Sequence, residues 1–333
     1  MELKLNNIGI IKNANITLDG LTVIAGENDT GKSTVGKVLY SLIKTINKVA
    51  NRKGNELIIG RYRNEYNHYI EDLFKNQIGT EGNITLIYNN VQYDIEIKHN
   101  KCSSFEPSKN TFLSNGGVTK PLMIETPFMW SIFPLLQTIR NIEVHQADLS
   151  AIDFRVPRTL QDLHFALTTK MKQNDHTLST DITQIIGGEF RADTIGDVKF
   201  YKNEMAVELI NTAMGIKYFG IMQLLMDNNH FYDGQILILD EPEVHLHPKW
   251  QLELAKIIIS LVQGGMYVLV NSHSPYMIEA LQRYGKLKSI KSHFYLAENG
   301  SISNGEGTLA RIFDKLSEPF DTFDELERSI LNG

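Results

Sequence analysis

The feature that most constrains this chain is a glycine-rich loop near its start, Gly26-Glu27-Asn28-Asp29-Thr30-Gly31-Lys32-Ser33. It is a full match to the pattern G-x-x-x-x-G-K-[ST]. The glycines let the backbone curl so that successive amide groups point at phosphate oxygens, and the start of the following helix adds a favourable dipole. The loop therefore predicts a phosphate-binding site whose contacts come from Asn28, Asp29, Thr30, Gly31, Lys32, Ser33 and Thr34.

The residues on either side of the loop supply the context that this pattern requires. Leu21–Ala25 is a compact apolar run, which is typical of a buried parallel strand. After the loop, apolar residues recur with helical spacing at Val35, Val38, Leu39, Leu42, Ile43 and Ile46. A glycine loop that arose by chance would not be expected between a strand and a helix. We expect Lys32 to reach the β- and γ-phosphates of ATP and Ser33 to ligate Mg²⁺.

Two adjacent acids follow a second apolar run, in the segment Ile236-Leu237-Ile238-Leu239-Asp240-Glu241-Pro242. Four buried residues would place both carboxylates at the carboxyl end of a strand. Paired acids also suit a solvated turn, but the phosphate loop favours a role in chemistry. Asp240 is then expected to hold Mg²⁺ through water, and Glu241 to orient and deprotonate the attacking water.

A histidine follows the next apolar run, in the segment Val270-Asn271-Ser272-His273-Ser274-Pro275. A histidine at a strand end, beside two loops that carry carboxylates, is placed to sense the γ-phosphate. Standing alone it would be interpreted as an ordinary hydrogen-bonded loop residue. Together with the phosphate loop and the two acids, His273 is the second catalytic candidate after Glu241.

Composition narrows the class of protein. The net charge of −6 weighs against a surface dominated by nucleic-acid binding, although a local basic patch for nucleic acid stays open. The single cysteine, Cys102, forms no internal disulfide and fits a reducing compartment. The start of the chain lacks the layout of a signal peptide, and no apolar run approaches the roughly 20 residues needed to span a bilayer. We expect a soluble cytoplasmic protein.

The pattern along the chain predicts an α/β fold in two lobes. Residues 1–125 should form a lobe of antiparallel strands with the phosphate loop, including a hairpin at 83–98 and a mobile connector over about 99–120. Residues 126–230 are mainly helical in pattern and are interpreted as an insertion. Residues 231–299 return to strand, helix and strand, which is typical of a parallel sheet with covering helices. Residues 300–333 form an acidic tail, interpreted as a closing helix or docking segment.

The order of these motifs resembles an ABC ATPase head, with a mixed β-sheet core, covering helices and a helical insertion. The opening Leu5–Ile16 and the run Leu21–Asn28 are similar to the RecF and SMC branch. The run Asp240-Glu241-Pro242-Glu243-Val244-His245-Leu246-His247-Pro248 resembles the OLD-type ATPases and their relatives in retron and Septu phage-defence systems. The resemblance covers nearly the whole chain.

The resemblance implies a homodimer that sandwiches two ATP molecules. The segment Asn211–Phe219 aligns with the family signature, so Gly215 and Lys217 would contact the nucleotide held by the other protomer. His247 would lie in the loop that crosses the interface between the two protomers. Ala213 stands at the usual signature serine and lacks its hydroxyl, which puts the strength of closure or the hydrolysis rate in doubt. The family glutamine that joins the helical insertion has no counterpart at the end of Ile124–Phe128.

Two other patterns receive structural interpretations. His245 and His247 could pair on a metal, but without a third ligand they are interpreted as structural. Glu241 and Glu243 suggest a two-metal nuclease, but ATPase chemistry already accounts for Glu241. Glu243 is therefore interpreted as a surface or hinge residue, and no acidic cluster of a TOPRIM nuclease follows residue 300.

An ATPase head without an effector domain should transmit its closure to another protein. The favoured hypothesis is the ATPase subunit of a bacterial anti-phage or toxin-type complex that controls a separately encoded effector such as a nuclease. The main alternative is a RecF-like repair ATPase that clamps DNA in a salt-sensitive way. A transporter ATPase and a scaffold that binds ATP without turnover are weaker alternatives.

Overall fold

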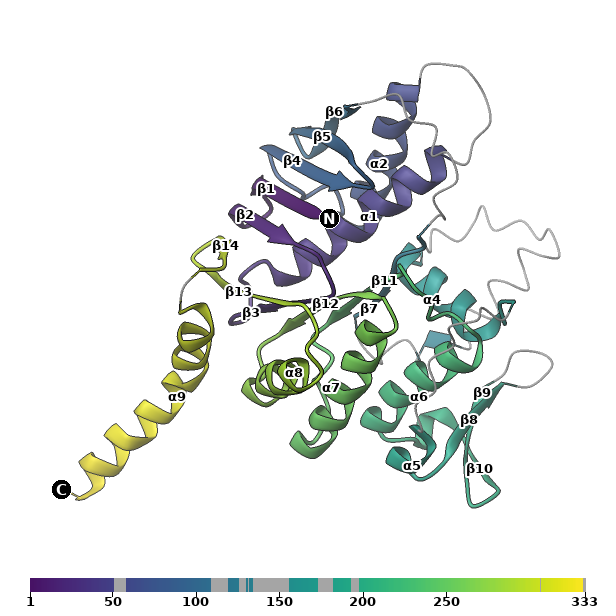
Figure 1. Cartoon of the computed structure of the whole chain (residues 1–333), viewed down its shortest axis with the longest axis vertical. Helices are drawn as coiled ribbons and strands as arrows, with labels where there is room; N and C mark the ends of the chain where they lie inside the picture. Colours follow the sequence, from purple (N-terminus) through teal and green to yellow (C-terminus); the bar gives the residue numbers. More distant parts are fainter. Residues whose placement is uncertain are drawn as a thin grey trace.

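The computed structural model describes residues 1–50, 58–108, 119–125, 130, 132–133, 156–172, 182–192, 198–305 and 307–331 of the 333-residue chain. Over these ranges the main element is a sheet of 11 strands in the order β6-β5-β4-β1-β2-β14-β13-β3-β12-β11-β7 (Figure 1). Its strands are β1 Glu2–Ile8, β2 Ile11–Thr17, β3 Leu21–Ala25, β4 Glu81–Tyr88, β5 Val91–Lys98, β6 Lys101–Pro107, β7 Leu122–Ile124, β11 Ile236–Asp240, β12 Tyr267–Ser272, β13 Ser292–Glu298 and β14 Ser301–Ser303.

The sheet has an antiparallel half and a parallel half. Strands β6, β5, β4, β1 and β2 are antiparallel neighbours, whereas β13, β3, β12, β11 and β7 run parallel. Parallel strands end at one edge of a sheet, where ligands bind in open α/β folds. The segments after β3, β11 and β12, which carry the predicted site residues, therefore meet at that edge.

Helices cover both faces of the sheet because the parallel strands are apolar on both sides. In β11, Leu237 and Leu239 face one core, and Ile236 and Ile238 face the other. Helices α1 (Lys32–Ala50) and α2 (Ile58–Phe74) pack in the second core. The first core holds α6 (Met214–Asp227), α7 (Pro248–Gln263) and α8 (Pro275–Leu287).

The predicted hairpin at 83–98 is present, and Asn89 and Asn90 both adopt positive φ, as a two-residue turn of type I′ requires. The prediction of a mobile connector from residue 99 is wrong for its first part, which forms β6. His99 and Asn100 also have φ of 50° and 61°, so a second turn of the same kind returns the chain. The remainder of the expected connector, 109–118, lies outside the described residues.

The segment expected to be a helical insertion contains helices and a second sheet. Its helices in the described ranges include α4 (Arg158–Thr168), α5 (Ile182–Ile186), the 3₁₀ turn Leu209–Asn211 and α6. An antiparallel three-stranded sheet stands between α5 and α6, made of β8 Glu189–Ala192, β9 Val198–Lys202 and β10 Met205–Val207. It was missed because its strands have only 4, 5 and 3 residues, too few for alternation to distinguish a strand from a helix.

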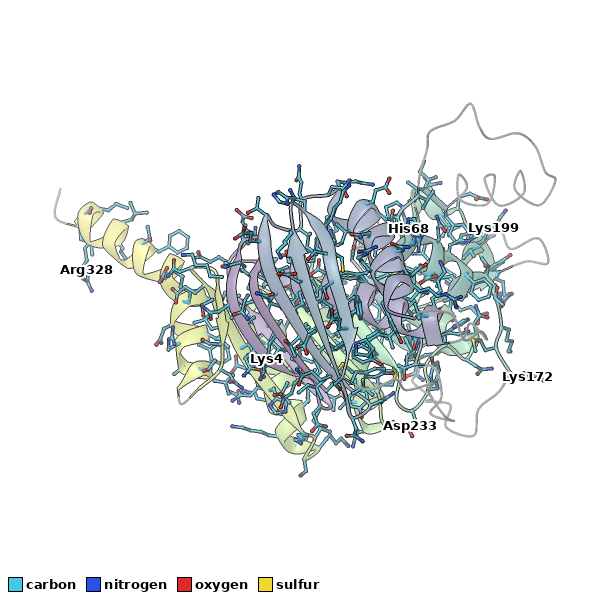
Figure 2. All side chains as sticks on the ribbon, turned by 90° about the horizontal axis from the view of Figure 1, so that it is seen from above. Lys4, His68, Lys172, Lys199, Asp233 and Arg328 are labelled. Atoms are coloured by element: carbon cyan, nitrogen blue, oxygen red, sulfur yellow. The ribbon has the colours of Figure 1, made fainter. Side chains whose placement is uncertain are left out.

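The acidic tail forms helix α9, Thr308–Leu331. Figures 1 and 2 show its distal part, with Arg328, extending away from the body of the molecule. None of the helices in the described ranges is long and apolar enough to cross a membrane.

Close contact between α1 and the sheet predicts opposite effects of two Gly→Ala changes. A Cβ on Gly36 would lie 2.9 Å from Ile238 Cγ2, whereas Gly60 in α2 has open space around it. Alanine favours a helix over glycine by about 1 kcal/mol. We expect Gly60→Ala to raise the free energy of unfolding by about 0.5–1 kcal/mol, and Gly36→Ala to lower it by about 1–3 kcal/mol. Denaturant unfolding measures both; equal stabilisation would contradict the tight contact.

Candidate nucleotide-binding and hydrolysis site

The lysine of the phosphate loop lies inside the loop that it is expected to serve. Lys32 is 3% exposed, and its Nζ donates to the backbone oxygens of Gly26 at 2.9 Å and Glu27 at 2.6 Å. Burial lowers the pKa of the Lys32 ammonium, and the nearby carboxylates of Glu241 and Asp240 oppose that shift. The ammonium therefore lies in a pocket that favours an anion beside it.

The loop conformation depends on its two pattern glycines. Gly31 has φ of 92°, and a Cβ there would lie 2.6 Å from Ile11 Cγ1. A Cβ on Gly26 would lie 2.5 Å from the carbonyl oxygen of Ala297. Strands β2 and β13 thus approach the loop too closely for a side chain. Asp29 also has positive φ, and Thr30 Oγ1 donates to the Glu27 carbonyl at 2.8 Å, which closes the turn.

The remaining loop residues lie where the sequence predicts. Asn28 and Asp29 are exposed at the tip of the loop, and Ser33 and Thr34 are half-buried in the first turn of α1. The backbone amides and the Ser33 hydroxyl are thus placed at a helix N-terminus, where phosphate and its metal ion are favoured.

Asn271 joins the acid pair to the phosphate loop, and sequence reasoning missed it. Its buried Nδ2 donates to Asp240 Oδ1 at 2.8 Å and to the Lys32 carbonyl oxygen at 3.0 Å. In the parallel register Asp240 is paired with Asn271, so the contact follows directly from the alignment of β11 and β12. The only hint in the sequence was an amide side chain directly after the apolar run Val268–Val270, and its partners come from the strand register.

Glu241 lies between the lysine and the histidine. Its Oε1 is 4.0 Å from Lys32 Nζ and 3.6 Å from His273 Nδ1. The Glu241 side chain is 33% exposed, so water can reach it. The structure thus brings Lys32, Asp240, Glu241 and His273 together at one edge of the sheet, as predicted.

The interpretation of Glu243 as a surface or hinge residue is wrong. Glu243 is 4% exposed and accepts hydrogen bonds from the loop that carries His273. Sequence reasoning failed here because a Glu two residues after the acid pair is usually solvated, and only the turn at positive-φ Glu241 directs this one inward.

A further acid, Glu125, borders the site. Ile124 pairs with Leu239, so Glu125 follows β7 where Asp240 ends β11. Burial, and secondarily the charge of Asp240, raises the pKa of the Glu125 carboxyl. Glu125 thus lies in the segment Ile124–Phe128, at whose end the resemblance predicts a glutamine that this chain lacks. Residues 126–128 lie outside the described ranges.

Of the residues assigned to the signature, Ala213 is exposed, whereas Gly215 and Lys217 are buried in their own chain. Ala213 is the N-cap of α6, and a Cβ on Gly215 would meet the Trp250 ring at 2.9 Å. Lys217 is buried, burial lowers the pKa of its ammonium, and its carbonyl oxygen accepts from Trp130 Nε1. Their action across a dimer stays a prediction.

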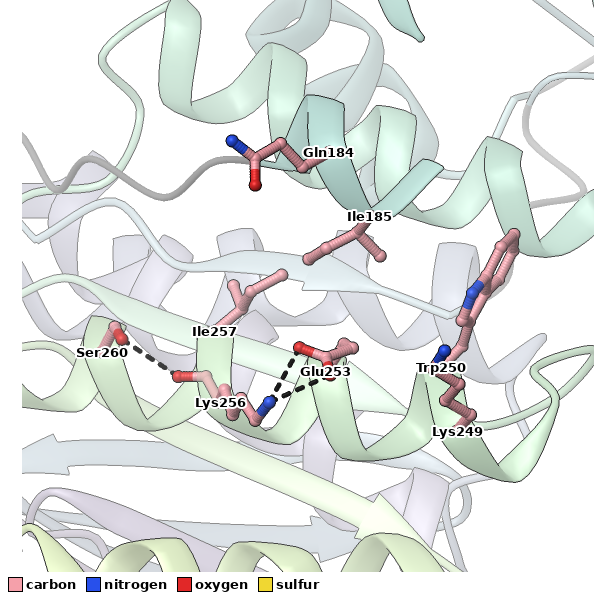
Figure 3. A pocket seen from close by; sticks show the side chains of 8 residues that line it. All are labelled: Gln184, Ile185, Lys249, Trp250, Glu253, Lys256, Ile257 and Ser260. Carbon is pink, nitrogen blue, oxygen red and sulfur yellow. Dashed lines mark hydrogen bonds and ion pairs between the residues drawn. The ribbon is translucent and has the colours of Figure 1, made fainter. Parts of the chain in front are cut away.

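Two cavities adjoin this region. One, of about 430 Å³, lies beside Trp250 between α5 and α7 (Figure 3), and its walls are Gln184, Ile185, Lys249, Trp250, Glu253, Lys256, Ile257 and Ser260. The other, of about 600 Å³, borders the phosphate loop and α9 and is lined by Glu27, Asn28, His273, Lys315, Leu316, Glu318 and Thr322.

His245 and His247 are exposed, and His247 Nδ1 accepts from the Lys249 amide as the N-cap of α7. Across the described residues no group of three or more His, Cys, Asp or Glu side chains is arranged to hold a metal ion.

Comparison with known proteins agrees with this geometry. Residues 136–278 match the family model described as AAA ATPase domain, a span that holds the acid pair and His273 but not the phosphate loop. The described fold resembles an SMC head bound to the C-terminal winged-helix domain of ScpA, with a TM-score of 0.53, 13% identity, and coverage of 91% of this chain and 95% of that one. The chain is an ATPase with the fold of an SMC head.

Two further similarities were found, one in fold and one in sequence. The SMC head with an extended coiled coil, bound to a ScpA domain from Pyrococcus furiosus, has a TM-score of 0.51 at 11% identity over 95% of this chain and 98% of that one. In sequence, the ATPase is 21% identical to Septu protein PtuA of Bacillus thuringiensis over 309 residues, 84% of this chain and 72% of the relative.

The buried position of Lys32 predicts that Lys32→Ala abolishes ATP binding or turnover, because no other group supplies its charge inside the loop. Fluorescent-nucleotide titration and phosphate release would measure the two effects. Lys44→Ala is the matched control, since Lys44 lies on the same helix but pairs with Asp162 on α4. Unchanged hydrolysis by the Lys32 variant would refute the phosphate-loop assignment.

Proposed function

We propose that this ATPase is the ATP-hydrolysing subunit of a bacterial anti-phage defence complex, and that its dimer controls a separately encoded effector such as a nuclease. The similarity to Septu protein PtuA along 84% of the chain carries the proposal. The segment Asp240–Pro248, which most resembles such ATPases, lies at the centre of the site. The activity would reside in the bacterial cytoplasm.

In the proposed mechanism, Lys32 and the loop amides bind the β- and γ-phosphates. The Ser33 hydroxyl and the Asp240 carboxylate are oxygen donors that suit Mg²⁺, which, when bound, neutralises charge on the phosphate oxygens. Asn271 orients Asp240 by its hydrogen bond. Glu241 orients the attacking water and accepts its proton, and His273 senses the γ-phosphate beside it.

The dimer would close around two nucleotides, with the N-terminus of α6 facing the partner's γ-phosphate. Ala213 makes no side-chain hydrogen bond to the first turn of α6. The amides at that helix end therefore remain candidates for an anion, even though the signature serine is replaced. Gly215 would also let α7 and Trp250 pack close to this turn.

Helix α9 is a candidate surface for the effector. Leu326, Ile330 and Leu331 on its distal part are more than half exposed, and exposed apolar groups on one element are typical of protein contacts. The sequence of this part is acidic, so the matching partner surface would be an apolar groove with basic residues at its rim. The proximal part lies beside the site, where Lys315 Nζ is 3.5 Å from Glu27 Oε1.

The test uses Glu241→Gln, which should bind ATP, hydrolyse it very slowly and accumulate closed dimers, because the water loses its base. We would tag this variant in its native gene neighbourhood, purify it with ATP and Mg²⁺, and measure the mass of the complex. A second polypeptide above the homodimer mass would support control of an effector. Lys32→Ala, purified in the same way, is the control that should not close.

Two other results would change the assignment. A homodimer without a second polypeptide, which binds duplex DNA in the presence of ATP and binds it more weakly as the salt concentration rises, would favour the RecF-like alternative over the defence role. Wild-type turnover by Glu241→Gln would remove Glu241 as the base.

A further inference from the structure

A buried carboxylate holds the loop that carries the switch histidine. Glu243 Oε1 accepts three hydrogen bonds, from Ser272 Oγ at 2.7 Å, the His273 amide at 2.8 Å and the Ser274 amide at 3.2 Å. The same oxygen is 3.3 Å from His273 Nδ1. One atom of one side chain thus contacts every residue of the segment 272–274.

This arrangement requires a strong acceptor. A buried carboxylate is destabilising unless donors surround it, and bonds from amides and hydroxyls to a charged oxygen are about twice as strong as neutral ones. The three donors satisfy Oε1, and the loop in turn gains a fixed conformation. Ser274 is held by a second hydrogen bond, because its Oγ donates to Oε1 of Gln251 on α7 at 2.6 Å.

The side chain of His273 lies at the outer end of this arrangement. It is 40% exposed, with Nδ1 3.6 Å from Glu241 Oε1. The backbone of His273 and the contacts of its ring with Glu241 and Glu243 position the imidazole, so the ring position depends on the loop conformation. Among the described residues Glu243 forms no hydrogen bond with the phosphate loop, and its charge influences the pKa of Lys32 less than the charges of Glu241 and Asp240 do, which separates its role from theirs.

We propose that Glu243 is the positioning residue of the switch loop, which holds the imidazole of His273 beside Glu241 for the hydrolysis step. The inference rests on the roles proposed for Glu241 and His273. It gives the second glutamate of the Asp-Glu-Pro-Glu run a function distinct from that of the first glutamate: Glu241 faces the attacking water, and Glu243 fixes the geometry behind it.

The test is a double-mutant cycle of Glu243→Gln and His273→Ala, read by single-turnover hydrolysis and by ATP affinity. We expect Glu243→Gln to slow hydrolysis about tenfold, with ATP affinity within about twofold of the wild type, because a neutral acceptor holds the loop less firmly. In the His273→Ala protein, the same change should have less than about a twofold effect, because the positioned ring is gone.

Glu65→Gln is the matched control, since Glu65 is also buried but pairs with Lys48 and Arg158 away from the site. It should lower thermal stability without slowing the hydrolysis step. Ser272→Ala is the second variant if Glu243→Gln fails to fold. It removes the 2.7 Å bond to Glu243 and the 3.1 Å bond that Ser272 Oγ accepts from the Ser274 amide, and it should slow hydrolysis about threefold, again only when His273 is present.

The results that would contradict the role of Glu243 differ from those that would contradict the role of His273. Equal slowing by Glu243→Gln with and without His273, or a parallel loss of ATP affinity, would overturn the positioning role alone. Unchanged hydrolysis by His273→Ala would overturn the proposed role of His273, and with it this inference.

Discussion

The site depends on the hydrogen bond between Asn271 and Asp240, together with the parallel register that makes it. Strands β3, β12 and β11 end side by side, so residues from three distant parts of the chain meet at one edge. The Asn271 side chain then donates hydrogen bonds both to Asp240 of β11 and to the carbonyl oxygen of Lys32 at the start of α1. Loss of this alignment would separate the phosphate-binding half of the site from the hydrolytic half.

Buried charge is the second constraint on this edge. Lys32, Asp240 and Glu243 are all nearly buried, which is tolerated only because each has partners of opposite charge or convergent donors. Such groups fix the geometry of a site more than they add stability, since an unpaired member would be strongly unfavourable. The same need for partners explains why Glu243, the second glutamate of the Asp-Glu-Pro-Glu run, is directed toward the donors of residues 272–274.

The site was predicted most successfully where the chemistry is local. The phosphate loop is continuous in sequence, and its flanking strand and helix have clear apolar periodicity, so Lys32 and Ser33 could be assigned directly. Asn271, Glu125 and Glu243 could not be assigned, because each acquires its neighbours across strands or through a turn. The strand β6 and the small sheet β8–β10 were missed because short apolar alternation does not distinguish strand from helix.

The sequence by itself determined the ATPase motifs, their order and the apolar runs that deliver them, because these features are written within a few consecutive residues. Only the tertiary structure decided which polar side chains share the site and which acid faces water. It also placed Gly215 and Lys217 within the core of their own chain. The reason is that burial and hydrogen-bond partners are properties of the assembled sheet edge, where segments more than two hundred residues apart, such as Lys32 and Asn271, come into contact.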